Sequence, residues 1–310
     1  MRCTPRRRPA FFVLDALIGL VATSVILLLL IPAVLRTRET SRGNLCKTHL
    51  KQIGEALQRY YASNEHFPPG GSSKNELSWH VLILPMLGYD ALFDQFDVAN
   101  GPYQSKTVNH RNNPYGLVTI SEFECPTALG NQSESEADAV NERHSYTVHY
   151  YGILGPRGES ASGATYRVSS QGPFAEQGIL GYDSHTRLAD ITDGTSRTIL
   201  VGELSWSDAR CYRSWVRGCN DDTIAGAKNV QWPIATVYFG KQFSRRYEHY
   251  IRDGNASGFN DVSLGSEHLG GTHLLMADGA VKFVPETIDL FVYRGAASVA
   301  GGEKESLDGQ

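Results

Sequence analysis

Residues Ala10–Leu35 read AFFVLDALIGLVATSVILLLLIPAVL, an apolar run of 26 residues with one charged residue, Asp15. At about 1.5 Å per residue a helix of this length extends about 39 Å, and a bilayer's hydrocarbon core is about 30 Å thick. The run therefore predicts a transmembrane helix over residues 11–35. Four arginines precede it, at positions 2, 6, 7 and 8, so the positive-inside rule predicts a cytoplasmic N-terminus.

Asp15 is the unusual residue of this run, because a carboxylate deep in a bilayer costs on the order of 3 kcal/mol or more. The cost falls if Asp15 lies near a helix N-terminus, whose dipole favours anions. Cleavage between Ala10 and Phe11 would create such an end, with a free α-amine four residues before Asp15. The simpler alternative is an acid that snorkels to the membrane face. We favour cleavage, because the surrounding pattern agrees with it.

A second helical pattern follows the apolar run and predicts an amphipathic continuation of the helix over residues 36–63. Its apolar positions recur at steps of four and three, which places them on one face of a helix. They are Cys46, Leu50, Ile53, Leu57 and Tyr60. The run HFPPGG at residues 66–71 is a strong helix breaker, so the helix should end just before it.

Residues 64–310 are expected to form a β-rich head domain. Residues 145–154 and 198–202 are typical of strands, and the pair Asp278-Gly279 between two apolar runs predicts a hairpin. The polar stretch 130–145 is expected to be a surface loop. The fold class is therefore α+β, with one long N-terminal helix packed on a β-rich head.

Composition excludes several functional classes. The 310 residues carry a net charge of −4, so the chain is not a basic nucleic-acid binder, and we expect no nucleic-acid partner. The sequence contains no G-x-S-x-G elbow, P-loop or H-E-x-x-H motif, so we expect no enzymatic activity.

The N-terminal pattern consists of a basic leader at residues 1–10, then Phe11, Asp15 and Pro32. It resembles the cleavage and methylation signal of type IV prepilins and type II secretion pseudopilins. The resemblance implies that a prepilin peptidase cuts after Ala10 and methylates the amine of Phe11. It also implies that Asp15 pairs with a neighbouring subunit's amine during assembly. Ala10 stands where that family usually has Gly, and Asp15 where it usually has Glu.

Further motifs extend over most of the chain. They are residues 42–57, 66–70, 78–97, 125–126, 191–203 and 268–279. In order and spacing they resemble the prepilin-like family named for its H-x9-DG motif, domain of unknown function 1559. His268 and Asp278 enclose nine residues, and Gly279 completes the motif. The resemblance implies a pilin-like helix with a β-rich head outside the cytoplasmic membrane, and it implies no known reaction.

The cysteines suggest an oxidising compartment. Cys3 would leave with the leader, and the remaining Cys46, Cys125, Cys211 and Cys219 allow three pairings. In one of these pairings Cys211 bonds Cys219 across a short loop, and Cys46 on the helix bonds Cys125 in the head. Buried thiols are the alternative.

Two groups of residues could be read as metal ligands. His268, His273 and Asp278 form the first, for which we favour a structural role, because zinc needs three or four placed ligands and the sequence shows no clear third. The second group has side-chain oxygens at alternate positions, as calcium-binding loops do. Leu264, however, stands at the position where a calcium loop has a bidentate Glu. Its members are Asp253, Asn255, Ser257 and Asp261. An ordinary polar turn is favoured there, so calcium is only an alternative and no cofactor is expected.

These observations predict a non-enzymatic, pilin-like or pseudopilin-like structural subunit. It should lie in the cytoplasmic (inner) membrane as a single-pass protein with its head outside the cytoplasm. Its expected partners are the membrane, a prepilin peptidase and other pilin-like subunits. The alternative is a tethered cell-envelope module that binds a glycan, a peptide or calcium. An envelope hydrolase is a third reading, for which the sequence nominates no catalytic residue.

Overall fold

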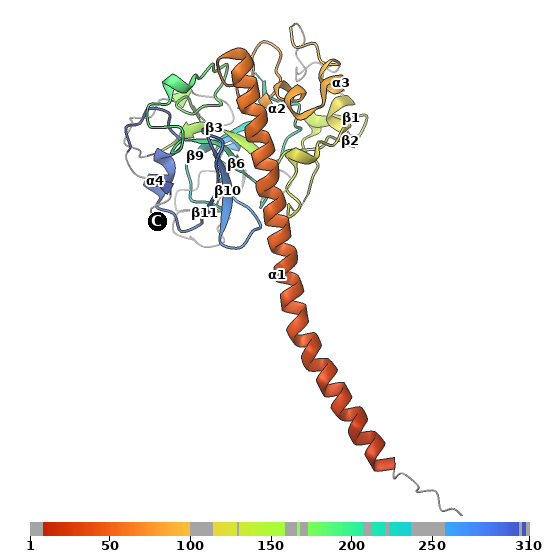
Figure 1. Cartoon of the computed structure of the whole chain (residues 1–310). Helices are drawn as coiled ribbons and strands as arrows, with labels where there is room; N and C mark the ends of the chain where they lie inside the picture. Colours follow the sequence, from red (N-terminus) through yellow and green to blue (C-terminus); the bar gives the residue numbers. More distant parts are fainter. Residues whose placement is uncertain are drawn as a thin grey trace, which may run out of the picture. The chain divides into compact units, whose positions relative to one another are not determined.

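The computed structural model describes residues 9–99, 114–128, 130–158, 166–167, 173–206, 212–220, 223–236, 258–303 and 306–307 (Figure 1). It divides into two compact units, Met1–Asn44 and Leu45–Gln310. The helices in the described residues are α1 (Pro9–Asn64), α2 (Trp79–Leu82), α3 (Asp90–Phe93) and α4 (Leu290–Gly295). The chain is α+β, as the sequence predicts.

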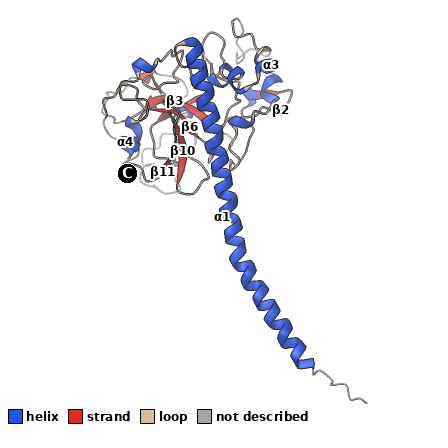
Figure 2. Ribbon diagram, in the orientation of Figure 1, coloured by secondary structure: helices blue, strands red, loops and turns tan. Residues whose placement is uncertain are grey.

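Most of the described strands are only two residues long (Figure 2). Those of the main sheet are β3 (Tyr150–Pro156), β6 (Ile199–Glu203), β9 (Ala227–Val230), β10 (Gly271–Met276) and β11 (Val281–Pro285). Three two-stranded pairs are formed by β1 (Ala139–Val140) with β2 (Arg143–His144), β4 (Tyr166–Arg167) with β5 (Phe174–Ala175), and β7 (Cys219–Asn220) with β8 (Thr223–Ile224).

The first unit contains the apolar part of α1, whose described side chains are largely exposed. Leu28 and Leu29 are each 70% exposed. The helix is long and apolar enough to cross a membrane, with a mean hydropathy of 2.7 in its most apolar window. Pro32 lies inside the helix without ending it. The predicted membrane-spanning element is therefore present as a helix.

The part of α1 from residue 45 onward packs into the second unit. The predicted stripe is confirmed: four of its members are fully buried and Tyr60 is half-buried. The fully buried members are Cys46, Leu50, Ile53 and Leu57. The polar face, which includes Lys47, Lys51, Glu55 and Arg59, is exposed. The helix ends at Asn64, immediately before the breaker run.

The end of α1 lies against strand β10. A Cβ at Gly54 would be 2.8 Å from the side chain of Leu275, so the helix backbone approaches the sheet closely there. The Gln58 side-chain amide donates a hydrogen bond to the carbonyl of Ala277 at 2.8 Å. These contacts, together with the buried stripe, hold the helix to the sheet.

The main sheet has the order β11-β10-β6-β3-β9. Its pairs are antiparallel except β3 with β9, which is parallel. All residues of β3, β6 and β10 are buried. The predicted hairpin is confirmed as β10 and β11, and its turn contains Gly279 at φ 89°, a conformation that glycine adopts readily.

The prediction of a surface loop over residues 130–145 is wrong in part. Ser133 and Asp138 are buried, and the Asp138 carboxylate accepts hydrogen bonds from the Ser133 hydroxyl and the backbone N–H of Ser214. Arg217 also contacts this carboxylate, at 3.1 Å. Because these partners come mostly from a segment about 80 residues later, composition alone could not show that the acid is buried and satisfied.

Candidate functional site

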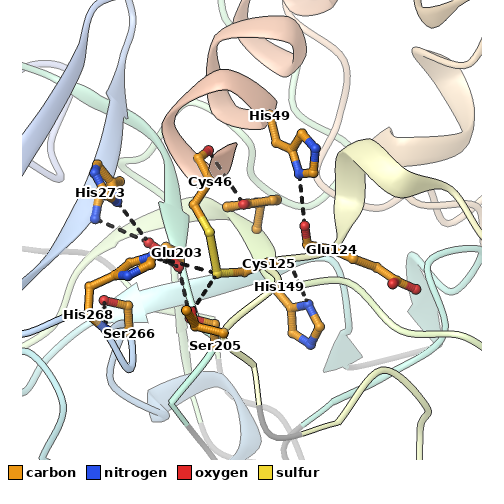
Figure 3. The surroundings of a disulfide bond; sticks show 12 residues. Cys46, His49, Glu124, Cys125, His149, Glu203, Ser205, Ser266, His268 and His273 are labelled. Atoms are coloured by element: carbon orange, nitrogen blue, oxygen red, sulfur yellow. Dashed lines mark hydrogen bonds and ion pairs between the residues drawn. A yellow bond between two sulfur atoms is a disulfide. The ribbon is translucent and has the colours of Figure 1, made fainter. Parts of the chain in front are cut away.

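A buried carboxylate lies at the end of β6. Glu203 is fully buried, as few glutamates are unless they are paired. Its Oε1 accepts a hydrogen bond from the Ser205 hydroxyl at 2.8 Å. Its Oε2 accepts the backbone N–H of His273 at 3.3 Å and lies 3.3 Å from that residue's Nδ1 (Figure 3). The carboxylate therefore accepts hydrogen bonds from the segment after β6 and from β10.

His268 approaches the same carboxylate from the segment before β10. Its Nε2 lies 3.6 Å from Oε1 of Glu203 and 3.8 Å from Sγ of Cys125. The backbone N–H of His268 donates to the Ser266 hydroxyl, which in turn donates to the carbonyl of Gly271. This local turn aims the imidazole at the carboxylate, as Figure 3 shows.

Cys46 and Cys125 form a disulfide beside Glu203 and His268, with their Cα atoms 5.4 Å apart. This is the helix-to-head bond of the pairing considered above. A nearby hydrogen bond joins the same segments, between His49 Nδ1 and the carbonyl of Glu124 at 2.8 Å. Cys219 is buried and its thiol donates to the carbonyl of Ser72 at 2.7 Å. Cys211 lies outside the described residues, so its pairing with Cys219 stays a prediction.

The two ends of the H-x9-DG motif do not meet. His268 precedes β10 and Asp278 follows it, and six strand residues extend about 20 Å. The Asp278 carboxylate accepts the N–H of Ala280 at 2.9 Å, and its own N–H donates to the carbonyl of Thr195. Asp278 therefore shapes the hairpin turn, as expected, and does not share a metal site with His268.

His149 supports the disulfide from the other side. Its Nδ1 accepts the backbone N–H of Cys125 at 3.0 Å, and its Nε2 donates to the carbonyl of Gly130 at 2.7 Å. Burial lowers the pKa of His149 to about 4. Burial likewise lowers the pKa of His80, whose Nε2 donates to the carbonyl of Tyr150, to about 3. Both rings are neutral parts of the core near pH 7.

Acidification is expected to destabilise the head through these two histidines. Between the unfolded-state pKa of about 6.5 and the lowered folded-state values, the unfolded chain binds more protons, so stability falls as pH falls. Each of the two histidines should lower the free energy of unfolding by about 3 kcal/mol as the pH falls from 7 to 4. Urea unfolding of the full chain in detergent, followed by tryptophan fluorescence across this pH range, measures the loss.

The control for this experiment is a matched pair of substitutions. His80→Gln should reduce the dependence of the unfolding free energy on pH by the equivalent of about one proton. His185→Gln, at an exposed histidine, should leave this dependence unchanged. Equal pH dependence of the unfolding free energy in wild type and His80→Gln would contradict the lowered pKa of His80.

The calcium alternative rests mainly on residues that the structure does not describe. Asp253, Asn255 and Ser257 lie outside the described residues. Asp261 is buried, and its carboxylate contacts the guanidinium of Arg157 and accepts the side-chain amide of Asn229 at 2.8 Å. These contacts engage both carboxylate oxygens of Asp261 with protein groups. Calcium binding here stays a prediction.

Ala10, Phe11, Asp15 and Pro32, the residues of the predicted N-terminal signal, lie on one continuous helix. Ala10 and Phe11 fall in the first turn of α1, and their side chains are outside the description. Asp15 is exposed on this helix. Processing at Ala10 and Phe11 and a role of Asp15 and Pro32 in assembly stay predictions.

Sequence reasoning missed Glu203 as the centre of this cluster. The available signal was an acid directly after the apolar residues ILVG at positions 199–202. An ionisable residue at the end of a fully buried strand must find partners or remain an uncompensated charge. Its neighbours His268 and Cys125 are distant in sequence, so only the fold shows which partners it has.

Comparison with known proteins places the chain in a family. Residues 36–290, most of the chain, match the family described as "Protein of unknown function (DUF1559)". The chain belongs to the DUF1559 family. No curated protein and no solved structure gave a significant match. The matched range of the DUF1559 chain includes Cys46, Cys125, Glu203 and His268, so the buried cluster lies within the family's domain.

Proposed function

We propose that this DUF1559 protein is a membrane-anchored, non-enzymatic structural subunit that assembles through its N-terminal helix in the manner of pilins and pseudopilins. The observation that carries the proposal is the single helix α1, which joins an apolar span to the buried stripe of the head. The apolar side chains of the span are exposed, so they can pack against lipid or against the helices of neighbouring subunits. Such a helix suits a subunit of an assembly.

Asp15 has a specific role in this proposal. Cleavage after Ala10 makes Phe11 the first residue, so Asp15 lies about one turn from the new amine. The positive end of the helix dipole stabilises an acid at this position. Pairing of the carboxylate with the amine of a neighbouring subunit would offset the cost of an acid in the membrane.

The orientation and the partners follow from the same argument. The leader arginines keep the N-terminus in the cytoplasm, where a prepilin peptidase would act, and the head lies outside the cytoplasmic membrane. Other pilin-like subunits would surround the helix. The disulfide between Cys46 and Cys125 supports an oxidising location for the head.

The intact mass and N-terminal sequence of the protein from native membranes test the proposal. We expect a chain that begins at methylated Phe11. Crosslinking in membranes should detect multimers, and Asp15→Ala should reduce them at least about 10-fold without changing the fluorescence of the head. The matched control is Ser24→Ala in the same span, because this hydroxyl donates to the helix's own backbone at the carbonyl of Leu20.

A chain that begins at Met1 would contradict prepilin processing. Multimers of Asp15→Ala equal to those of wild type would contradict the assembly role of the acid. Either result would favour the alternative, a tethered binding module of the cell envelope.

A further inference from the structure

Four potential metal ligands converge in the head. They are Cys46 and Cys125, which form the disulfide, and the side chains of Glu203 and His268. One ligand atom from each lies within 4.8 Å of the others, and all four residues are buried. Cys46 lies on α1, Glu203 at the end of β6 and His268 in the turn before β10 (Figure 3). Cys125 lies in the segment between α3 and β1.

The separations suit a tetrahedral metal ion. Zinc bonds of about 2.0–2.3 Å to nitrogen, oxygen and sulfur place neighbouring ligands about 3.3–3.8 Å apart in a tetrahedron. Nε2 of His268 lies 3.6 Å from the Glu203 carboxylate and 3.8 Å from Sγ of Cys125. The two sulfurs are bonded to each other in the oxidised form.

We propose that reduction of the Cys46–Cys125 disulfide converts this cluster into a zinc site with Cys46, Cys125, Glu203 and His268 as its four ligands. The protein then has two forms of one centre, a disulfide when oxidised and a zinc complex when reduced. The proposal is independent of the function of the N-terminal helix.

The conversion balances with a dithiol as the reductant. The dithiol supplies two electrons and two protons, the Cys46–Cys125 bond breaks, and the dithiol becomes a disulfide. The two protein thiols then release their protons as two zinc–sulfur bonds form. One Zn²⁺ is bound and two protons leave.

The groups around the cluster suit ligands of a metal. The Thr127 hydroxyl lies 3.0 Å from Sγ of Cys125, where it can donate to a thiolate. Glu203 already accepts hydrogen bonds from Ser205 and from the N–H of His273, which fix the carboxylate. Such outer contacts orient metal ligands. Two thiolates with an imidazole and a carboxylate favour zinc over calcium or magnesium, which prefer oxygen ligands.

The site also explains why a carboxylate is buried beside a disulfide. Zinc offsets two of the three negative charges that the two thiolates and Glu203 carry after reduction. Either form ties Cys46 on α1 to Cys125 in the head. The attachment between these segments therefore persists when the redox state changes.

Zinc binding by the full chain in detergent tests the proposal. The protein is reduced with a phosphine, which takes an oxygen from water and does not compete for zinc as a dithiol does, and is then mixed with Zn²⁺ and desalted. We expect one zinc per reduced chain and none per oxidised chain at this site. Cobalt in place of zinc should show the visible absorption of a tetrahedral site and a sulfur-to-metal charge-transfer band.

Matched double variants assign the zinc to its ligands. Cys46→Ser/Cys125→Ser should abolish binding, and Cys211→Ser/Cys219→Ser should keep it. His268→Ala and Glu203→Gln should each weaken binding at least about 10-fold. Tryptophan fluorescence checks that each variant is folded, and the comparison of oxidised and reduced wild type needs no variant.

Three results would overturn the proposal. The first is a reduced wild type that binds no zinc. The second is loss of zinc binding in Cys211→Ser/Cys219→Ser and not in Cys46→Ser/Cys125→Ser. The third is an unchanged affinity for zinc in both His268→Ala and Glu203→Gln. The last would show that the side chains of these two residues are not ligands.

Discussion

Replacing both Cys46 and Cys125 by alanine is expected to lower the free energy of unfolding of the head by about 4 kcal/mol. The disulfide joins residues separated by 79 positions, so its loss frees a long loop in the unfolded chain. The chain-entropy estimate for such a loop is about 4.5 kcal/mol, and removal of native disulfides typically costs about 2–5 kcal/mol. Changing both cysteines avoids leaving one reactive thiol in the core.

Urea unfolding of the full chain in detergent measures this loss, under non-reducing conditions and with a chelator that removes zinc. All four tryptophans lie beyond residue 78, so their fluorescence reports on the head. Ser24→Ala is the control, because this residue lies in the apolar part of α1, outside the head, and its loss should change the free energy of unfolding of the head by less than about 0.5 kcal/mol. A double variant as stable as wild type would show that the bond contributes nothing to the fold.

Gly218→Ala is expected to destabilise the head by about 3 kcal/mol or more. A Cβ at Gly218 would lie 1.9 Å from the carbonyl oxygen of Leu77, which is backbone and cannot move aside independently. The two segments are hydrogen-bonded there, since the N–H of Gly218 donates to Glu76 and the N–H of Ser78 donates to Val216. The added methyl group must separate these segments and weaken both bonds.

Gly181→Ala is the matched control for this substitution. Its Cβ would meet the side chain of Ser184 at 3.4 Å, which is ordinary van der Waals contact, so its effect should be within about 1 kcal/mol. Urea unfolding of the two variants gives the comparison. If Gly218→Ala unfolds at the same urea concentration as Gly181→Ala, the close approach of the two segments is not needed for stability.

The buried cluster gives the family motif a physical meaning in two separate parts. His268 serves the centre around Glu203, and Asp278-Gly279 serves the turn at the far end of β10. Strand β10 therefore connects His268 of the cluster to the turn at Asp278-Gly279. His268 and Asp278 of this chain therefore need not act on one ligand.

Local patterns in the sequence were sufficient for the long helix and for the hairpin. The apolar run from Ala10 and the stripe through Cys46 and Leu50 repeat with the period of a helix, and that signal depends only on neighbouring residues. The pair Asp278-Gly279 needs a tight turn for the same local reason. The membrane-spanning element, the helix end near residue 64 and the β10–β11 turn were all predictable in this way.

Only the tertiary structure decided which distant residues meet. Glu203, His268 and the two cysteines lie on segments up to about 220 positions apart, and Asp138 is satisfied by donors about 80 positions away. Spacing along the chain says nothing about such pairs, because contacts between distant segments depend on how the sheet and α1 pack. The sequence by itself therefore determined the anchor, the stripe and the turn, whereas packing decided the cluster at the centre of the head.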